Sequence, residues 1–399
     1  MFRGSLNLGK PFGIRLRAHW SLLIIFLLIA AHLGFGVLPN WHPDWSGPMI
    51  AAVAVGAALI FFASIALHEL AHALTARLYG LEVGDITLFL FGGVSNIESE
   101  PRTPLSEAVI AIVGPIASIV IGASMLGIAA FTVRDLGLIE TDPEAYLASI
   151  GPFTTVLLWV GPINLLLAIF NMIPAFPLDG GRVLRAILWG ATNDLTRATR
   201  WATGVSIGLS WVLIGTGLLM ALGFAVPFLG AGLVGGLWLA VIGWFIGQSA
   251  RASLVAQELS SSLEGVQAGD LASRDVPTVT PDTPIELVVK RYVSGGVDDP
   301  LLVRDGQTVV GVVHIDDVQA IPRSDWSQLT AGDVMREFQP DDTIRPEDPA
   351  YEAFRKISRH NARELPVVGE DGRFAGVIRL ADLMRWVRMY GPRRPPRAA

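Results

Sequence analysis

Six long apolar segments, separated by short polar stretches, divide the first 250 residues of the chain. The pattern predicts helices over Trp20–Leu38, Met49–Leu78, Leu105–Val133, Phe153–Ile173, Gly204–Leu222 and Phe228–Gly247. A helix that crosses a bilayer needs about 20 predominantly apolar residues, and these segments approach or exceed that length. We therefore predict a polytopic α-helical membrane domain of about six transmembrane helices at residues 1–250.

The composition points the same way. Hydrophobic residues make up 51% of the chain and charged residues only 17%, whereas an average soluble domain is about 25% charged. The formal net charge of −6 gives no reason to expect nucleic acid as a partner. The sequence contains no cysteine, which excludes disulfides, all-cysteine zinc sites and thiol nucleophiles.

Basic residues are distributed unevenly among the predicted loops, and this asymmetry predicts the topology. One set of regions contains Arg3, Lys10, Arg15, Arg17, Arg77, Arg102, Arg182, Arg185, Arg197, Arg200 and Arg251. The alternate loops, Pro39–Pro48, Arg134–Pro152 and Gly223–Pro227, contain a single basic residue, Arg134. By the positive-inside rule, both termini are expected in the cytoplasm of a multi-pass protein of the cell membrane. The N-terminus lacks a small-residue cleavage site, so we expect the first span to be uncleaved.

The second apolar segment contains the motif His68-Glu69-Leu70-Ala71-His72. On a helix, histidines at positions i and i+4 project from one face, which is the spacing that binds Zn²⁺ while the glutamate acts on the metal-bound water. The alternative is a polar face of an ordinary soluble helix. The apolar neighbours disfavour it, because an ionisable group in the hydrocarbon costs about 2.5–3.5 kcal/mol on insertion scales and usually marks function.

A second motif, NMIPAFPLDGG, follows the fourth predicted span at residues 171–181. A catalytic zinc uses three protein ligands and keeps one position open, so Asp179 is the candidate third ligand beside His68 and His72. The alternative is that Asp179 caps the helix beginning GGRVLRAIL, because aspartate is a preferred N-cap residue. Both motifs are expected at the same cytoplasmic depth, and this agreement favours the metal site.

The segment Leu81–Ser99 between the second and third spans is rich in β-forming residues. Its Gly92-Gly93 pair suits a hairpin turn, so we predict a small membrane-associated β-hairpin. In one interpretation, its edge strand pairs with an extended substrate. In the other, the segment is a short amphiphilic loop at the membrane interface.

After Gln248 the composition becomes that of a soluble protein. We expect a polar, partly helical linker at 251–269, followed by an internal repeat in which Pro300–Gly311 matches Leu365–Gly376. Each copy is typical of one α/β unit with the order helix, strand, turn, strand, helix. The repeats are placed at 270–325 and 326–390, and the basic, proline-rich tail at 391–399 is expected to be disordered.

Together these motifs resemble the site-2 protease family of intramembrane zinc metalloproteases. The resemblance rests on HELAH at 68–72, FGGV at 91–94 and N-x-x-P-x-x-P-x-D-G at 171–180. It implies that His68, His72 and Asp179 bind one zinc ion and that Glu69 is the general base and acid. Asn171 would support substrate or the oxyanion, although a helix-end asparagine also caps backbone. Gly92 and Gly93 would belong to the substrate-binding hairpin.

The resemblance also implies a partner: a single-span membrane protein in the lipid bilayer, such as an anti-sigma factor, cleaved in or near its transmembrane segment in regulated intramembrane proteolysis. Such cleavage requires local unwinding, because a transmembrane helix keeps its carbonyls in internal hydrogen bonds. The rival function is a membrane ion or metal transporter gated by its C-terminal domain. A transport path would place ionisable residues at several depths, whereas here they concentrate at one predicted cytoplasmic-side cluster.

The C-terminal repeat resembles a pair of CBS domains, which one subgroup of the family carries after six spans. The resemblance implies a regulatory adenine nucleotide, such as ATP or AMP, with Asp317 and Asp382 on the ribose. His314 and Arg379 stand where the family has Ser or Thr, and Arg379 is able to hold a phosphate by charge-assisted hydrogen bonds. The alternative is a ligand-free module for docking or homodimerisation.

Overall fold

The computed structural model divides the chain into two compact units, Phe2–Leu254 and Val255–Ala399. It describes residues 5–89, 92–97, 101–132, 141–227, 229–274, 276–295, 301–306, 308–337, 343–360, 362, 364–370 and 373–390. The predicted tail at 391–399 lies outside these residues.

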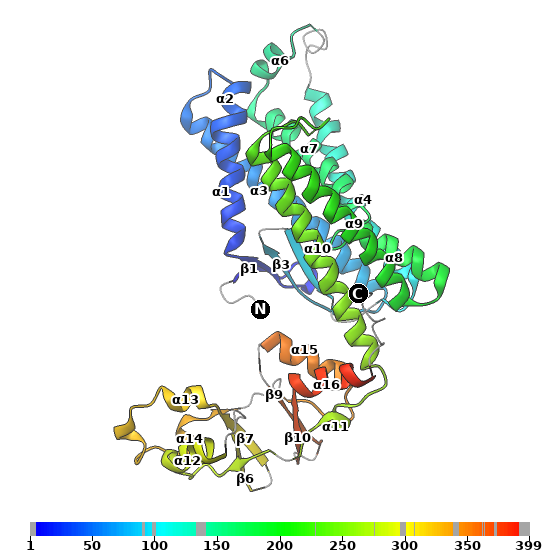
Figure 1. The fold of residues 1–399 in the computed structure, drawn as a ribbon. Helices are drawn as coiled ribbons and strands as arrows, with labels where there is room; N and C mark the ends of the chain where they lie inside the picture. The colour runs from blue at the N-terminus through cyan, green and yellow to red at the C-terminus, as the bar shows by residue number, and fades with distance from the viewer. Residues whose placement is uncertain are drawn as a thin grey trace. The chain divides into compact units, whose positions relative to one another are not determined.

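The described part of the first unit contains six helices long and apolar enough to cross a membrane. The first comprises α1 (Ser21–His32), the π-helical turn η2 (Leu33–Val37) and α2 (Leu38–Trp41). The others are α3 (Gly47–Leu78), α4 (Pro104–Thr132), α7 (Pro152–Asn171), α9 (Leu195–Ala221) and α10 (Leu233–Ser262). Figure 1 shows them side by side, with the short helices α6 (Pro143–Ser149) and α8 (Asp179–Thr192) between spans. The prediction of a six-helix membrane domain is confirmed.

Helix α4 occupies a central position, because it packs against α3, α7 and α8. Glycines allow it to approach α7 closely: a methyl group on Gly122 would lie 2.7 Å from the carbonyl oxygen of Gly161. Small residues commonly allow such close approach in membrane helices. In lipid, the hydrophobic effect does not drive helix association, so close van der Waals packing contributes more. Helix α4 therefore contacts every element that carries a residue of the two predicted zinc motifs.

A four-stranded sheet packs against α3. Its order is β1 (Ser5–Gly9), β2 (Leu16–His19), β3 (Val83–Phe89) and β4 (Gly92–Ile97), with a 3-10 turn η1 (Pro11–Gly13) between the first two strands. Strands β3 and β4 form the predicted hairpin, which is antiparallel and pairs Phe89 with Gly92. Contrary to the prediction, Gly92 and Gly93 are the first residues of strand β4 and do not form the turn. Parallel pairing of β2 with β3 was not predicted.

The sheet is attached to α3 by an apolar cluster and by polar contacts. Ile86 and Leu88 of β3, with Ile14 of the β1–β2 connection, are buried against Leu70 and Ala73, which belong to the helix turns around the HExxH motif. At the end of α3, the Arg77 guanidinium donates to the carbonyl oxygens of Phe12 and Gly13 in the β1–β2 connection. The sheet therefore lies directly beside the predicted zinc-binding motif.

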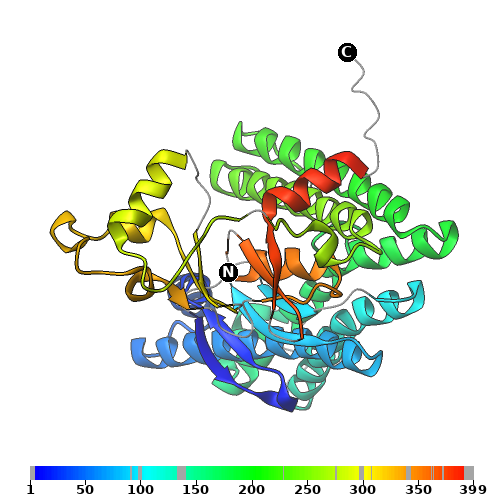
Figure 2. The ribbon, with the colours of Figure 1, turned by 90° about the horizontal axis from the view of Figure 1, so that it is seen from below.

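The second unit contains the two predicted repeats (Figure 2). The first comprises β5 (Thr278–Val279), α12 (Ile285–Gly295), β6 (Leu301–Asp305), β7 (Thr308–Val313), α13 (Ile315–Gln319) and η3 (Arg323–Asp325). The elements α14 (Ala331–Val334) and β8 (Arg336–Glu337) lie in the range predicted for the second repeat, but β8 pairs with β7 in the sheet of the first. The second comprises α15 (Ala350–His360), β9 (Glu364–Val368), β10 (Phe374–Arg379) and α16 (Leu380–Tyr390), and α11 (Ala268–Leu271) packs on it. Their sheets have the orders β5-β6-β7-β8 and β10-β9.

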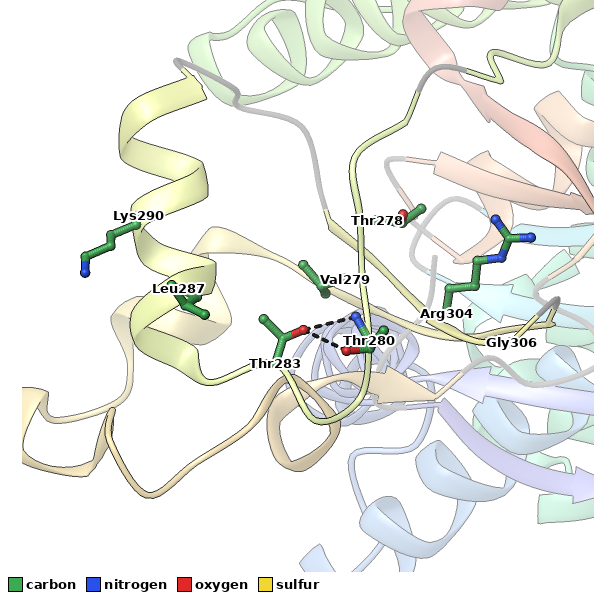
Figure 3. Close-up of a pocket in the computed structure, with 8 residues that line it drawn as sticks. All are labelled: Thr278, Val279, Thr280, Thr283, Leu287, Lys290, Arg304 and Gly306. Carbon is green, nitrogen blue, oxygen red and sulfur yellow. Dashed lines mark hydrogen bonds between the residues drawn. The ribbon is translucent and has the colours of Figure 1, made fainter.

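A cleft of about 700 Å³ lies in the first repeat, as Figure 3 shows. It is lined by Thr278, Val279, Thr280, Thr283, Leu287, Lys290, Arg304 and Gly306. The hydroxyls of Thr280 and Thr283 are 3.0 Å apart and hydrogen-bonded. The residues predicted to bind nucleotide, Asp317, Asp382 and Arg379, do not line this cleft.

Helix α10 runs without interruption to Ser262, through the first part of the segment predicted to be a polar linker. Just past the boundary between the units, Leu259 and Leu263 are buried in the hydrophobic core of the second repeat, where Ile344 and Ile357 also lie. The indole nitrogen of Trp386 donates to the carbonyl oxygen of Ser262. The end of this helix is therefore part of the second unit's core.

Candidate metal centre

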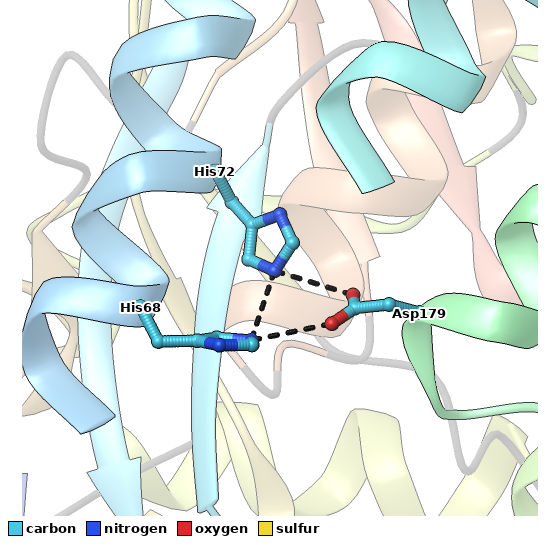
Figure 4. A group of neighbouring side chains, drawn as sticks. All are labelled: His68, His72 and Asp179. Carbon is cyan, nitrogen blue, oxygen red and sulfur yellow. Dashed lines mark hydrogen bonds and ion pairs between the residues drawn. The ribbon is translucent and has the colours of Figure 1, made fainter. Parts of the chain in front are cut away.

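Three side chains from two elements of the membrane unit converge on one point, as Figure 4 shows. His68 and His72 come from α3, and Asp179 is the first residue of α8. The two histidine Nε2 atoms are 3.1 Å apart, and each lies 3.2 Å from one oxygen of the Asp179 carboxylate. All three residues are at most 9% exposed. The structure therefore brings together the three predicted zinc ligands, although Asp179 is more than 100 positions away in the sequence.

The outer nitrogens of both histidines are held by α4. The Nδ1 of His72 lies 2.6 Å from the carbonyl oxygen of Ile110, and the Nδ1 of His68 lies 2.9 Å from the hydroxyl oxygen of Ser118. Because a carbonyl oxygen only accepts, His72 donates from Nδ1, and the Nε2 of the neutral ring carries a lone pair. Such outer contacts fix the orientation and tautomer of metal-binding histidines.

The donor set fits a zinc ion. Lone pairs and a carboxylate that face one another at 3.1–3.2 Å repel unless a cation or a proton lies between them. Ligands about 2.0–2.1 Å from a tetrahedral zinc are roughly 3.3 Å from each other, close to the separations found here. Two imidazoles and one carboxylate also leave a coordination position open, as catalytic zinc sites require.

Asp179 reaches the histidines because the loop before it is unusually compact. A methyl group on Gly180 would lie 2.3 Å from the carbonyl oxygen of Met172, and one on Gly181 would lie 2.6 Å from the backbone nitrogen of Phe176. Only glycine fits such close backbone approaches. Leu178 occupies the N-cap of α8 and the helix has no side-chain cap hydrogen bond, so the alternative role of Asp179 as a helix cap is not supported.

The electrostatic surroundings of Asp179 favour its ionised form. Burial alone would raise the pKa of this carboxyl, but when His68 and His72 are protonated their hydrogen bonds and positive charges lower the pKa more. The net pKa lies well below the ordinary value for aspartate. The carboxylate is therefore ready to act as a metal ligand at neutral pH.

Two glycines lie against the predicted zinc ligands and the predicted general base. A methyl group on Gly114 of α4 would lie 2.1 Å from the Nε2 of His72 and 2.7 Å from the Nε2 of His68. A methyl group on Gly93 of β4 would lie 2.2 Å from the Cγ of Glu69. Sequence analysis predicted Gly93 but missed Gly114 and Ser118. Gly114 and Ser118 are four residues apart and so lie on one face of α4, and this spacing of small residues was the signal that could have indicated them.

Comparison with known proteins agrees with this geometry. Residues 56–137 and 136–215 match peptidase family M50, and residues 268–321 and 331–389 match the CBS domain. The chain is 31% identical to Rip3 of Mycobacterium tuberculosis, which is named as a zinc metalloprotease, over 97% of this chain and 94% of that protein. The chain belongs to peptidase family M50, the site-2 protease family. Its membership confirms the resemblance drawn from the motifs.

Two further proteins of this kind are similar to the chain to different extents. A protein of Synechocystis sp., sll0528, also named as a zinc metalloprotease, is 31% identical over 96% of this chain and 95% of its own length. The solved site-2 protease from Methanocaldococcus jannaschii is 27% identical, covers 63% of this chain and 95% of its own, and has a TM-score of 0.40. The chain is therefore a zinc metalloprotease of family M50 with a CBS pair, which disfavours the transporter alternative.

The other predicted site residues of this M50 peptidase, Asn171 and Glu69, differ in how close they lie to the three ligands. Asn171 is the half-buried last residue of α7, and among the described residues its side chain forms no hydrogen bond. Glu69 is half-buried beside His68 and lies against β4 at Gly93. The structure thus places Glu69 at the metal centre, whereas the role of Asn171 stays a prediction.

In the CBS pair, the predicted nucleotide-binding residues are engaged within the protein. Asp317 accepts hydrogen bonds from the Nε and Nη2 of Arg336. Asp382 accepts a 3.3 Å hydrogen bond from the backbone nitrogen of Arg379 and lies 3.5 Å from the Arg385 guanidinium. Asp317 and Asp382 both lie in the first turn of a helix that follows a strand hairpin. Their equivalent positions agree with the repeat seen in the sequence.

Proposed function

We propose that this protein is an intramembrane endopeptidase that hydrolyses a peptide bond in or near the transmembrane segment of a single-span membrane protein. His68, His72 and Asp179 would hold one zinc ion, and Glu69 would be the general base and acid. The observation that carries the proposal is the convergence of three ligand atoms beside Glu69, two of them on a helix long enough to span a bilayer.

Each residue of the centre has a separate task. A zinc ion bound there supplies Lewis acidity, which polarises a carbonyl and lowers the pKa of a coordinated water. Glu69 accepts the proton of the attacking water and delivers it to the leaving amine. Ser118 and the Ile110 carbonyl keep the two histidine rings in the orientation that points both Nε2 atoms inward.

The sheet supports a binding mode for the substrate. Strand β4 is the last strand in its sheet, so one of its edges pairs with no other strand among the described residues. An extended segment that adds to this edge would be held by backbone hydrogen bonds, and Gly93 would bring it next to Glu69. Gly92 and Gly93 leave space for the backbone of the substrate, and Asn171 would support the substrate or the oxyanion.

The CBS pair would regulate this activity by binding an adenine nucleotide such as ATP or AMP. Asp317 and Asp382 would bind the ribose and Arg379 a phosphate. The Arg336–Asp317 contact must open for the ribose to reach Asp317. A cytoplasmic position of both termini and of the CBS pair is supported by the distribution of basic residues. Homodimerisation through the CBS pair and an anti-sigma factor as substrate remain predictions of the resemblance.

The test is cleavage of a panel of single-span membrane proteins by the full-length enzyme in proteoliposomes. Glu69→Gln is expected to abolish cleavage but keep zinc, whereas Asp179→Asn is expected to lose both. Glu144→Gln, the same change at an exposed position in α6, is the matched control and should leave both unchanged. Undiminished cleavage by Glu69→Gln would contradict the assignment, and divalent-cation flux without any cleavage would favour a transporter.

A further inference from the structure

A buried ion pair connects α4 with α8 close to the metal centre. The Nε of Arg185 donates to Oε1 of Glu107 at 2.6 Å, and its Nη2 contacts the same oxygen. The Glu107 side chain is 0% exposed and that of Arg185 13% exposed. Breaking a pair this deeply buried leaves an uncompensated charge, yet an intact pair adds little net stability over apolar side chains of similar volume. Stability alone is therefore a weak explanation for the pair.

The position of the pair suggests a different explanation. Glu107 lies one helical turn before Ile110, whose carbonyl holds His72, and the same helix holds His68 through Ser118. Arg185 belongs to α8, the helix that begins with Asp179. The ion pair thus joins the helix that orients two ligands to the helix that carries the third.

Arg185 also contacts the loop that delivers Asp179. Its guanidinium carbon lies over the ring of Phe176, 5.7 Å from the ring centre, which is the distance of a cation–π contact. Phe176 is 4% exposed and packs against Ala202 of α9 and Ala250 of α10. Arg185 therefore links the two segments that flank Asp179 in the sequence: it belongs to the helix after Asp179 and contacts the loop before it.

We propose that Glu107 and Arg185 form a positioning pair that sets the distance from the Asp179 carboxylate to His68 and His72. The proposal rests on the metal centre proposed above. Metal and catalytic sites require their side chains to be held within about 0.5 Å of the productive geometry. Loss of Arg185 removes this ion pair between α8 and α4 and the cation–π contact with the Phe176 loop, so Asp179 gains freedom to move relative to the histidines.

The test compares four variants of the full-length protein: Arg185→Met, Glu107→Gln, the double variant that combines them, and Arg197→Met. Arg197 pairs with Asp194 on an exposed surface at the start of α9. Arg197→Met is therefore the control, because it removes an ion pair away from the metal centre. Three quantities are measured: the zinc dissociation constant by chelator competition, the visible spectrum of the Co²⁺-substituted protein, and the unfolding temperature of the metal-free protein.

Arg185→Met is expected to weaken zinc binding about 10- to 100-fold, the usual effect of removing a partner that supports a metal ligand. The double variant removes both charges of the pair at once, so its unfolding temperature should lie above that of the less stable single variant, while its zinc affinity stays low and its cobalt spectrum stays altered. Arg197→Met should bind zinc as the wild type does. Arg185→Lys keeps the charge but loses the planar fork, so it should fold and bind zinc several-fold more weakly.

A double variant and an Arg185→Lys variant with wild-type zinc affinity and cobalt spectrum would overturn the proposal and leave the pair a purely structural role. A different result would count against the metal centre itself. If the wild type binds no more zinc than a His68→Ala variant, the proposed function fails, whatever the ion-pair variants do. The two failures are therefore distinguishable in one set of samples.

Discussion

Replacing Gly114 with alanine adds one methyl group where the two histidine ligands meet α4. The methyl carbon would lie 2.1 Å from the Nε2 of His72 and 2.7 Å from that of His68. Nonpolar atoms pack favourably at about 3.5–4.0 Å, so the His72 ring would have to move by roughly 1.4 Å. This shift is nearly three times the tolerance of about 0.5 Å for a metal or catalytic site. We therefore expect Gly114→Ala to lose zinc and, with it, peptidase activity.

The same helix offers a matched control. A methyl group on Gly127 meets no atom within 4 Å, so Gly127→Ala makes the same chemical change in α4 without contact with the centre. Both variants gain about 1 kcal/mol of helix propensity, so a difference between them does not come from helix propensity. Zinc content after gel filtration, unfolding temperature and cleavage are measured for both. Stoichiometric zinc and normal cleavage in Gly114→Ala would refute the reasoning.

Three further predictions follow from other contacts. Gly93→Ala should push Glu69 aside, because the new methyl group would lie 2.2 Å from the Cγ of Glu69. Cleavage should fall about 100-fold or more, while the zinc content stays normal. A loss of zinc would contradict this prediction. Arg336→Ala should free Asp317 from its contact with Arg336 and so tighten the binding of adenine nucleotide. Calorimetry on the full-length protein measures the affinity. An unchanged affinity would show that the Arg336–Asp317 contact does not compete with the ribose. Burial lowers the pKa of His42 below its ordinary 6.5, so the unfolded state binds more protons than the folded state does. The unfolding temperature should therefore fall as the pH drops below about 6.5. His42→Gln should flatten this pH dependence, and an equal slope of unfolding temperature against pH in both proteins would contradict the prediction.

The membrane helices and the metal ligands were predictable because each has a strong local signal. A span is recognised by its length and composition, and the HExxH motif fixes its geometry within one helix. Asp179 was predicted from chemistry, since two histidines leave a catalytic zinc one ligand short. These signals need no knowledge of how distant segments pack.

The parts of the site that escaped prediction depend on packing between distant segments. Ser118 and Gly114 resemble the small residues that commonly line helix contacts in membranes, and only the structure shows that they face the histidines. The pairing of β2 with β3 joins Leu16 to Ile86, and short strands with little alternation give no signal for such a remote partner. The Glu107–Arg185 pair was equally hidden, because single charges near a helix end are usually solvated.

The length of α10 determines where this protein can be divided. Leu259 and Leu263 complete the core of the second repeat, and burying a leucine contributes about 1.5–3 kcal/mol. A fragment that begins at residue 270 would contain every strand of both repeats yet lose roughly 3–6 kcal/mol of core packing, which rivals the whole stability of a small domain. A soluble CBS pair should therefore start near Val255, inside a helix whose residues up to Leu254 belong to the membrane unit.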